Sequence, residues 1–551
     1  EKSVTGDWLS RIYNTATSSN PSGLLVRVDD PDSTGILFGA NANGTYRFVV
    51  KPDGKVGIGT SSPSYKLDVD HGAVSSSDQT IARFMAESSR QLGLVWDDSA
   101  STLGLATLTD HNLVFHTNGN SNPRMVIDNN SRISLSNNDG GAGNTVFGEL
   151  AGNALASGGN YNLLIGKEAG NDLTTSDHNV AIGFQALSKA TANLDGNTAV
   201  GNYAMGSVVS NDVNNCTAIG YASMSVGVLE AGASGTVAVG FGTLDNLTSG
   251  DGNVAIGYLS GNSMTTGARN VVIGYQAGDA MTIATRSVAI GYGALGTEDV
   301  GDRSIAIGFN SLFSQNSDSN NETTGNVGIG VEAGFYNQTG QYNTLIGTGA
   351  GLGASGQSNN NNTALGYSAL NVVTTGSHNV VIGRSSGDAV TDGSYNVFMG
   401  YYAGSTTTSA QRTVAIGSEA LETGNHDQDG TVAIGSKALQ RLTTGVGNVA
   451  IGLEANGNVT TSSWNTVIGY KALSSGTASA NNNTAIGFEA GRYLGDDGTS
   501  NHSSFNTIIG RKAMGGGNTS DATLNTAHLN IAIGHHAVGG STGTGTALTA
   551  T

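Results

Sequence analysis

Aromatic side chains at a regular spacing are the residues of this chain with the clearest chemical potential. A short motif of the form Asn-Val-Ala-Ile-Gly recurs along the sequence, and Tyr or Phe follows its glycine in 11 of 22 copies. Such a row of rings would suit stacking on the sugars of a glycan. It would equally suit covering neighbouring turns while the phenol hydroxyl stays in water, and we favour this covering role. The candidate glycan-contacting residues are Tyr258, Tyr275, Tyr292, Tyr367, Tyr401 and Tyr470.

Histidine and carboxylate side chains offer weaker candidates for chemistry. His535 and His536 are adjacent in the last repeat, but other repeats carry Tyr, Lys, Glu or Gln there, so we interpret the pair as surface substitutions. Adjacent strand residues also point to opposite faces, which disfavours chelation. Acidic residues gather in longer inserts, at Asp427, Asp429 and Asp496-Asp497, without the nine-residue calcium repeat. We therefore predict no metal and no cofactor.

Catalytic signatures are missing from the sequence. It contains no Gly-x-Ser-x-Gly elbow, no phosphate-binding loop and no zinc-spaced set of Cys and His. Paired carboxylates of the kind that hydrolyse glycosidic bonds do not recur at a fixed spacing. We predict that the protein is not an enzyme.

Composition limits the fold and the partners. The net charge of −18 disfavours nucleic-acid binding through phosphate contacts, and no apolar stretch is long enough for membrane insertion. Charged residues make up 12% of the 551 residues, aromatic residues 6%, and 83 residues are Gly. This supply of large apolar groups suits many thin stacked layers better than several thick cores. The single cysteine, Cys216, excludes an intrachain disulfide framework.

The spacing of the motif defines the fold. Of the 21 intervals between motif glycines, 11 are 17 residues long and none is shorter. A fixed minimum with occasional additions is typical of one structural turn with loop insertions. An apolar residue stands directly before the glycine in all 22 copies, and a β-branched residue stands three places before it in every copy except Leu163, which favours a strand over a helix. We predict an all-β protein in which residues 141–540 form a parallel β-solenoid, or β-roll, of about 22 coils.

Each motif position has an expected structural role. Asn precedes the strand in 16 copies, where stacked amides can form a hydrogen-bonded ladder between turns. Small residues three places after the glycine indicate a crowded corner, and Thr-Thr-Gly indicates the returning turn. The residues predicted to define the repeat are Gly148, Gly166, Gly183, Gly257, Gly274, Gly291, Gly308, Gly417, Gly452, Gly469, Ile182, Ile256, Ile290, Ile451, Asn179, Asn253 and Asn448.

The predicted strand is apolar on both faces, because the bulkier residues point one way and Ala the other. Such strands are normally buried on both sides. One coil has a single interior, so another copy of the chain is the simplest cover for the second face. We predict a homo-oligomer, with the bulky face inside the coil and the small face at the contact between subunits.

Residues 1–140 differ in kind from the repeats. All five prolines lie within the first 123 residues, and alternating runs at 46–50 and 112–116 predict short antiparallel strands with tight turns. We expect residues 1–140 to form a smaller β-rich shaft or attachment region. Residues 541–551 form a C-terminal tail, which we interpret as a processing end.

Two family resemblances extend this interpretation. The repeated Asn-Val-Ala-Ile-Gly, followed by Ala and then Gly or Leu, resembles the head repeats of trimeric autotransporter adhesins, which form β-rolls in a trimer. The segment Asp-Gly-Lys-Val-Gly-Ile-Gly-Thr-Ser-Ser-Pro-Ser-Tyr-Lys-Leu-Asp-Val at 53–69 resembles bacteriophage tail-fibre and tailspike proteins, with a partial echo at 124–129. The resemblances imply a homotrimeric fibre. In the second family such segments often occur beside a C-terminal chaperone that is cut off after trimerisation, so here the chaperone has either been removed or was never present.

Together these observations predict a structural fibre of a virion, a phage tail or capsid fibre, that serves host attachment at an extracellular position on the virion surface. Its expected partners are further copies of itself, a host cell-surface glycan or protein receptor, and other virion proteins through residues 1–140. Long inserts at 314–324, 491–504 and 515–528 are the expected receptor contacts. The alternatives are a bacterial trimeric adhesin or extracellular filament, a glycan-degrading tailspike and an ice-binding solenoid.

Overall fold

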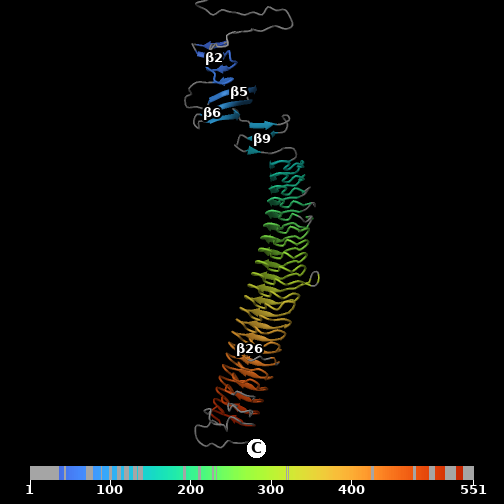
Figure 1. The fold of residues 1–551 in the computed structure, drawn as a ribbon, viewed down its shortest axis with the longest axis vertical. Helices are drawn as coiled ribbons and strands as arrows, with labels where there is room; N and C mark the ends of the chain where they lie inside the picture. The colour runs from blue at the N-terminus through green and yellow to red at the C-terminus, as the bar shows by residue number, and fades with distance from the viewer. Residues whose placement is uncertain are drawn as a thin grey trace, which may run out of the picture. The chain divides into compact units, whose positions relative to one another are not determined.

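The computed structural model describes residues 36–69 apart from 37, 43 and 44, six strands between residues 79 and 134, and most of residues 141–537. The gaps in the last range are at 190–193, 209–212, 226–228, 231, 318, 320–321, 424–426, 428, 476–479, 495–502 and 516–528. The chain divides into two compact units, Glu1–Ser134 and Leu135–Thr551. Within the described residues all regular structure is β-strand, as predicted (Figure 1).

The first unit contains three small sheets. One sheet has the order β1 (Phe38–Ala42), β2 (Thr45–Val50), β3 (Val56–Ile58), β4 (Leu67–Val69). The other two are antiparallel and consist of β5 (Gln79–Glu87), β6 (Arg90–Asp97) and β7 (Thr102–Thr107), and of β8 (Leu113–His116), β9 (Pro123–Ile127) and β10 (Ile133–Ser134).

Strands β2 and β8 confirm the runs that the sequence marked as strands. One pairing differs from the expected antiparallel pattern, because β3 and β4 are parallel. The segment between them returns the chain to the start of β3 before β4 begins, so the two strands run in the same direction.

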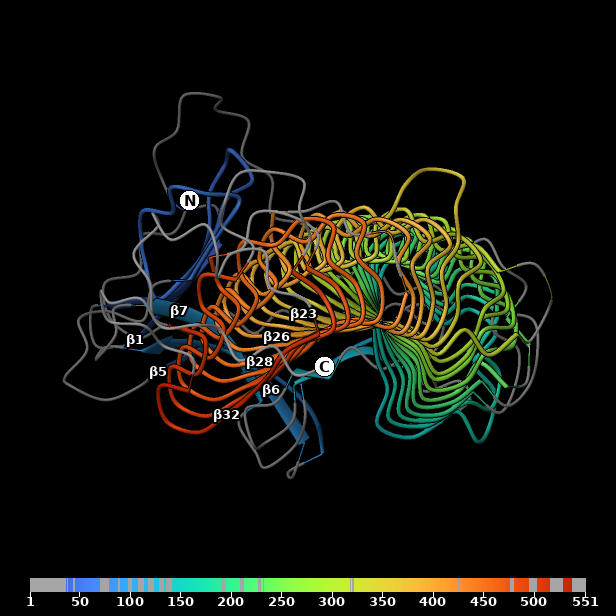
Figure 2. The same ribbon diagram turned by 90° about the horizontal axis from the view of Figure 1, so that it is seen from below.

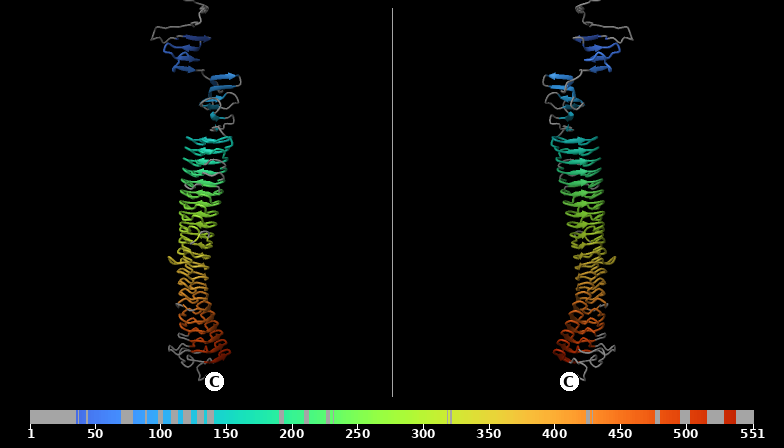
Figure 3. Two further views of the ribbon diagram at one scale, coloured as in Figure 1. Left: turned by 90° about the vertical axis from the view of Figure 1, so that its right-hand side faces the viewer. Right: turned by 90° about the vertical axis from the view of Figure 1, so that its left-hand side faces the viewer.

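The second unit is a single parallel ladder of 22 three-residue strands, each paired in register with the next (Figures 1 and 3). The strands are β11 (Thr145–Phe147), β12 (Leu163–Ile165), β13 (Val180–Ile182), β14 (Thr198–Val200), β15 (Thr217–Ile219), β16 (Val237–Val239), β17 (Val254–Ile256), β18 (Val271–Ile273), β19 (Val288–Ile290), β20 (Ile305–Ile307), β21 (Val327–Ile329), β22 (Thr344–Ile346), β23 (Thr363–Leu365), β24 (Val380–Ile382), β25 (Val397–Met399), β26 (Val414–Ile416), β27 (Val432–Ile434), β28 (Val449–Ile451), β29 (Thr466–Ile468), β30 (Thr484–Ile486), β31 (Thr507–Ile509) and β32 (Ile531–Ile533). The predicted parallel solenoid is confirmed. The rest of each coil is turn, and Figure 2, seen from below, shows the coils rotating progressively along the stack.

The middle residue of each strand points into the coil, and its two neighbours point outward. Ala181, Ala255 and Ala450 are fully buried, whereas the flanking Val and Ile side chains stay partly exposed. The expectation that the bulky residues would fill the coil is therefore wrong. The returning wall contributes its own apolar side chains to the interior, which leaves space for a small residue on the strand side in most coils.

The asparagine that precedes 16 of the 22 strands closes its coil. Asn379 donates its backbone N–H to Oδ1 of Asn362 in the preceding coil, at 3.0 Å, and its side-chain Nδ2 donates to the same oxygen at 3.1 Å. The amide also donates across the interior to the carbonyl oxygen of Gly393, at 2.9 Å. Asn179, Asn253 and Asn448 make the same crossing bond, to residues on the opposite wall. The amide ladder expected from the sequence is thus present, with a cross-coil bond added to it.

The motif glycines are required by backbone geometry and by contact with the next coil. All 22 have φ between +126° and +143°, a range that residues with a side chain rarely adopt. A Cβ at Gly274 would lie 2.4 Å from the carbonyl oxygen of Gly291, and every other motif glycine except Gly534 in the last coil has an equivalent obstruction. The glycine therefore allows each strand end to lie directly against the next.

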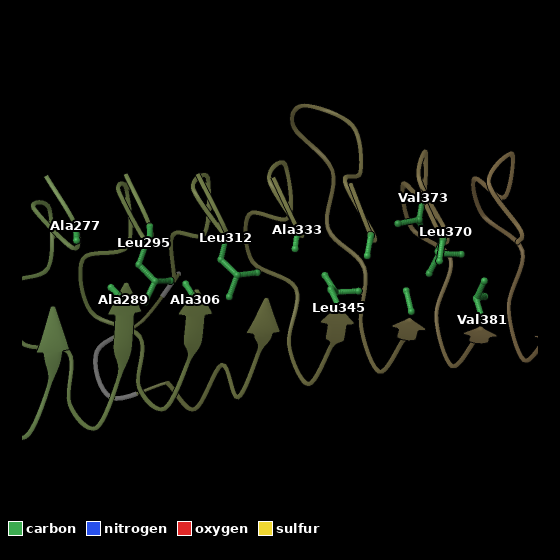
Figure 4. Packing of buried hydrophobic residues seen from close by; sticks show 14 of the residues in the cluster. Ala277, Ala289, Leu295, Ala306, Leu312, Ala333, Leu345, Leu370, Val373 and Val381 are labelled. Carbon is green, nitrogen blue, oxygen red and sulfur yellow. The ribbon is translucent and has the colours of Figure 1, made fainter. Parts of the chain in front are cut away.

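Two of the inward positions of a coil, the middle strand residue and the residue six places later, compensate one another in size in most coils. In nine coils Ala is paired with Leu or Met, as in Ala289 with Leu295 and Ala306 with Leu312 (Figure 4). In six coils a larger residue is paired with Gly, as in Leu345 with Gly351 and Phe398 with Gly404.

Where both positions are small, large residues of the adjacent coils fill the space. Gly328 and Gly334 form such a pair, and a Cβ at Gly334 would meet Leu312 and Leu345 at 2.7 and 2.8 Å. The core is thus packed largely by size compensation, within a coil or between adjacent coils.

This complementarity predicts the outcome of exchanging one pair for another. Phe398→Ala alone should lower stability by about 3–5 kcal/mol, because it leaves a cavity beside Gly387 and Gly404. Gly404→Leu alone should also destabilise, since a Cβ there would lie 2.9 Å from the Phe398 ring. The double variant restores the Ala–Leu pairing and should recover at least half of the loss in the unfolding midpoint. A double variant whose loss of stability equals the sum of the two single losses would contradict the pairing.

Candidate functional surface: the outward face of the strands

The outward strand residues form two rows that run the length of the ladder, one apolar throughout and one that mixes apolar residues with Thr, and we call these rows the outward face. The first row is Val, Thr, Ile or Leu, and the second is largely Ile. Exposure is substantial: Ile256 is 38% exposed and Leu365 44%. The predicted repeat residues Ile182, Ile290 and Ile451 lie in the second row and are partly exposed. A continuous apolar surface of this length is typical of an interface rather than of a solvated face.

A column of residues directly after the motif glycines, the aromatic column, lies beside the outward face. Six rings in consecutive coils, from Tyr221 to Phe309, stack on one another with centroid separations of 5.1–5.4 Å and interplanar angles of 3–16°. Tyr258, Tyr275 and Tyr292 belong to this stack and are 44–49% exposed. Their faces are therefore covered by neighbouring rings, and the exposed parts are edges and hydroxyls.

The other predicted aromatic residues are also packed against neighbours in the column. Tyr367 and Tyr401 flank Arg384, whose guanidinium carbon lies 5.8 Å from each ring centroid. Tyr470 stacks on Phe488 at 5.0 Å, with an interplanar angle of 18°. Glycan contact at these rings stays a prediction. The geometry supports the covering role, because a sugar stacks on a ring face rather than on an edge.

A second set of exposed rings was missed by sequence reasoning. The residue directly before the ladder asparagine, which we call the corner column, has a left-handed backbone in every coil. Five of its members are aromatic and more than half exposed: Tyr161, Tyr342, Tyr395, Trp464 and Phe505. Their alignment is visible once the sequence is written with the asparagines in one column, because each ring stands one place before its asparagine.

Charged side chains alternate in sign in another column, two places after the motif glycine. Ion pairs join Lys437 to Glu419 at 3.4 Å and Lys471 to Glu454 at 3.3 Å. The hydrogen bond with Glu454 raises the pKa of the Lys471 ammonium. Exposed pairs of this kind contribute little stability individually, but the alternation keeps like charges apart in coils stacked at about 4.8 Å.

The histidine pair lies in the turn after the last motif glycine, and not in a strand. The rings of His535 and His536 are 4.4 Å apart, so the expectation that they point to opposite faces is wrong. His535 also hydrogen-bonds the guanidinium of Arg511, at 3.0 Å. Within the described part of the chain, no three His, Cys, Asp or Glu side chains come together as a metal-binding group.

The acidic candidates divide between described and undescribed residues. Asp427 accepts hydrogen bonds from Thr408 and Ser409, and these bonds lower the pKa of its carboxyl against the opposing effect of partial burial. Asp429 accepts from the backbone N–H of Gln411 at 2.9 Å. Both therefore join neighbouring coils. Asp496-Asp497 and most of the inserts at 491–504 and 515–528 lie outside the described residues.

The insert at 314–324 is anchored by a buried carboxylate. Glu298 is fully buried, and its Oε1 accepts from the backbone N–H groups of Gly301 at 2.7 Å and Ser317 at 3.3 Å. The Ser317 hydroxyl donates to Oε2 at 3.2 Å. Burial raises the pKa of Glu298, while these hydrogen bonds oppose the rise. Glu298 occupies an inward position that holds Met264 and Met281 in the two preceding coils. Instead of an apolar side chain, this coil therefore has a carboxylate there that binds the insert through Ser317.

The threonine rows of the returning turn are used internally. Thr248, Thr265 and Thr282 each donate their hydroxyl to a carbonyl of the next coil, at 3.0–3.2 Å. Because these hydroxyls donate to carbonyl oxygens within the protein, the threonine rows do not form the ordered array of free hydroxyls that ice binding would need.

Comparisons with protein-family models, curated proteins and solved structures find no match for this chain. No helix with the length and hydropathy needed to span a bilayer occurs among the residues that the structure describes.

The buried carboxylate generates a prediction about pH. Because the pKa of Glu298 is raised in the folded protein, the folded state holds this proton more tightly than the unfolded chain does. Its contribution to stability is therefore greatest at acid pH and declines as the pH rises through the folded-state pKa. Glu298→Gln should flatten the dependence of the urea unfolding midpoint on pH above about 4. The exposed Glu149→Gln should leave the dependence unchanged, and a Glu298→Gln profile parallel to that of the wild type would contradict the assignment.

Proposed function

We propose that the protein is a homo-oligomeric structural fibre, in which the outward faces of the strands from several copies cover one another. The observation that carries this proposal is the second row of the outward face, which is apolar in all 22 strands of the ladder and partly exposed. A stable interface between proteins needs about 800 Å² on each partner. The two rows over a ladder of this length supply a candidate surface well above a small contact patch.

A second copy of the same chain fits this surface better than an unrelated partner. The face repeats two residues in every coil, a β-branched residue in nearly all coils and an apolar one, so a partner must offer a matching repeat at the same spacing of about 4.8 Å. Another solenoid of the same sequence does so automatically. The resemblance to trimeric fibre families favours three copies.

In this proposal the fibre serves host attachment on a virion surface, with residues 1–140 joining it to other virion proteins. The support is the rigid ladder, its anchored insert at 314–324 and the resemblance of residues 53–69 to tail-fibre proteins. A bacterial surface adhesin would use the same architecture. Flanking tail genes would favour the virion fibre, and a downstream membrane-anchor barrel would favour the adhesin.

Substitution on the outward face tests the oligomer. Ile273→Asp with Ile290→Asp places two carboxylates in adjacent coils of the face and should convert the assembly to monomers of 55.5 kDa in mass photometry. Thr266→Asp with Ile283→Asp places two carboxylates in adjacent coils of the returning turn, and should leave the oligomer intact. Wild-type protein found only at 55.5 kDa, or an outward-face variant that stays assembled, would refute the proposal.

A further inference from the structure

We infer that the corner column carries a binding site for a linear, uncharged glycan, centred on Trp464 and Phe505. This inference deepens the proposed attachment role and rests on it. It moves the glycan contact away from the aromatic column, whose ring faces are covered by one another, to rings whose faces are not stacked.

The backbone of the corner column makes an aromatic residue there an unfavourable choice for folding. Every coil adopts a left-handed conformation at this position, with φ of 60° at Trp464 and 61° at Phe505. Gly and Asn adopt this conformation most readily, and the column contains Gly in seven coils and Asn in three. A large ring costs conformational energy there and gains little from burial, since Trp464 is 61% exposed and Phe505 58%. The fold does not require these rings.

The structure nevertheless leaves space for the Trp464 ring against the preceding coil. A Cβ at Gly447, the corner residue of the preceding coil, would lie 2.4 Å from Cε3 and 2.5 Å from Cζ3 of the indole. The six-membered ring therefore occupies the space that a side chain at 447 would need. Gly325 leaves the same space for Tyr342, because a Cβ at Gly325 would lie 3.0 Å from Cδ1 of the Tyr342 ring. A glycine in one coil thus supports an exposed ring in the next, which holds the ring in a fixed orientation.

Trp464 is open where two other rings of the corner column are covered. Tyr161 is stacked on His178 at 5.1 Å, and Tyr395 on His378 at 4.8 Å. Within the described residues, no aromatic ring and no cation stacks on Trp464 or on Phe505. An exposed indole held against the backbone on one side offers an apolar face of the kind that stacks on a pyranose ring.

The spacing of the site suits a chain of sugars. Trp464, Asn482 and Phe505 occupy the corner column in three consecutive coils, so the two rings lie roughly 10 Å apart with an exposed amide between them. One pyranose of an extended β-1,4-linked chain is about as long as one coil rise of about 4.8 Å. Sugars could then contact ring, amide and ring in register, with the Asn482 amide available to their hydroxyls. The net charge of −18 favours an uncharged glycan over an anionic one.

The test uses the intact protein with cellohexaose and chitohexaose as probes. Titration calorimetry and tryptophan emission should show binding, with an emission change that comes from Trp464. Trp464→Asn installs the residue that the next coil carries naturally, so the fold should be retained. It should weaken binding at least tenfold and abolish the emission change, with unchanged unfolding midpoint and oligomer mass.

A matched control is Tyr470→Ser, in the same coil but in the aromatic column, where two other coils carry Ser. It should bind within about twofold of the wild type. The inference is overturned if neither hexasaccharide binds the wild type, if Trp464→Asn binds equally well, or if Trp464→Asn dissociates the oligomer, which would assign the ring to a subunit interface. A wild-type monomer that still binds glycan would instead refute the proposed assembly and leave this site standing.

Discussion

Most coils of the solenoid close around one buried amide, and other features of the repeat follow from that closure. The Nδ2 group of the ladder asparagine reaches a carbonyl on the opposite wall, at 2.6–2.9 Å in the coils from Asn179 to Asn483. This bond fixes how far apart the two walls can be. The interior is then narrow, and in most coils only one of the two facing positions, the middle strand residue and the residue six places later, holds a large side chain. The bulky strand residues are excluded from this narrow space and point outward, which produces the apolar face that we assign to self-association.

The repeat itself was predictable from the sequence because its cause is local. The 17-residue minimum, the alternation of apolar residues and the glycine after Ile are each properties of one coil, and they gave the strand positions and the parallel ladder. Which face of the strand points into the coil was not predictable from the alternation, since a period of two identifies two faces without saying which one is inside. The volume relation between residues such as Phe398 and Gly404 holds that information, because only side chains that share an interior compensate one another.

Other misses have the same origin in backbone conformation. The histidine pair was judged as part of a strand, but the strand ends at Gly534 and the next two residues lie in a turn, where the rings meet. The corner column was overlooked because left-handed φ values cannot be seen in residue types when Trp, Tyr and Arg occupy the position beside Gly and Asn. Asn456 is an exception to the apolar interior. It is fully buried at a position that holds Leu in the coils before and after it, and neither Nδ2 nor Oδ1 of its side-chain amide has a hydrogen-bond partner.

The unfolding free energy of ladder variants is the most direct measure of whether the buried amide governs the coil. Asn379→Ala removes two donated bonds and the acceptor for the backbone N–H of Asn396, leaving buried polar groups unpaired on both sides. Asn379→Ser keeps an acceptor at the position, as Ser287 does for Ser304. The account predicts that Asn379→Ala loses roughly 3 kcal/mol or more in denaturant unfolding, and that Asn379→Ser loses about half as much. An Asn379→Ala protein within about 0.5 kcal/mol of the wild type would contradict it.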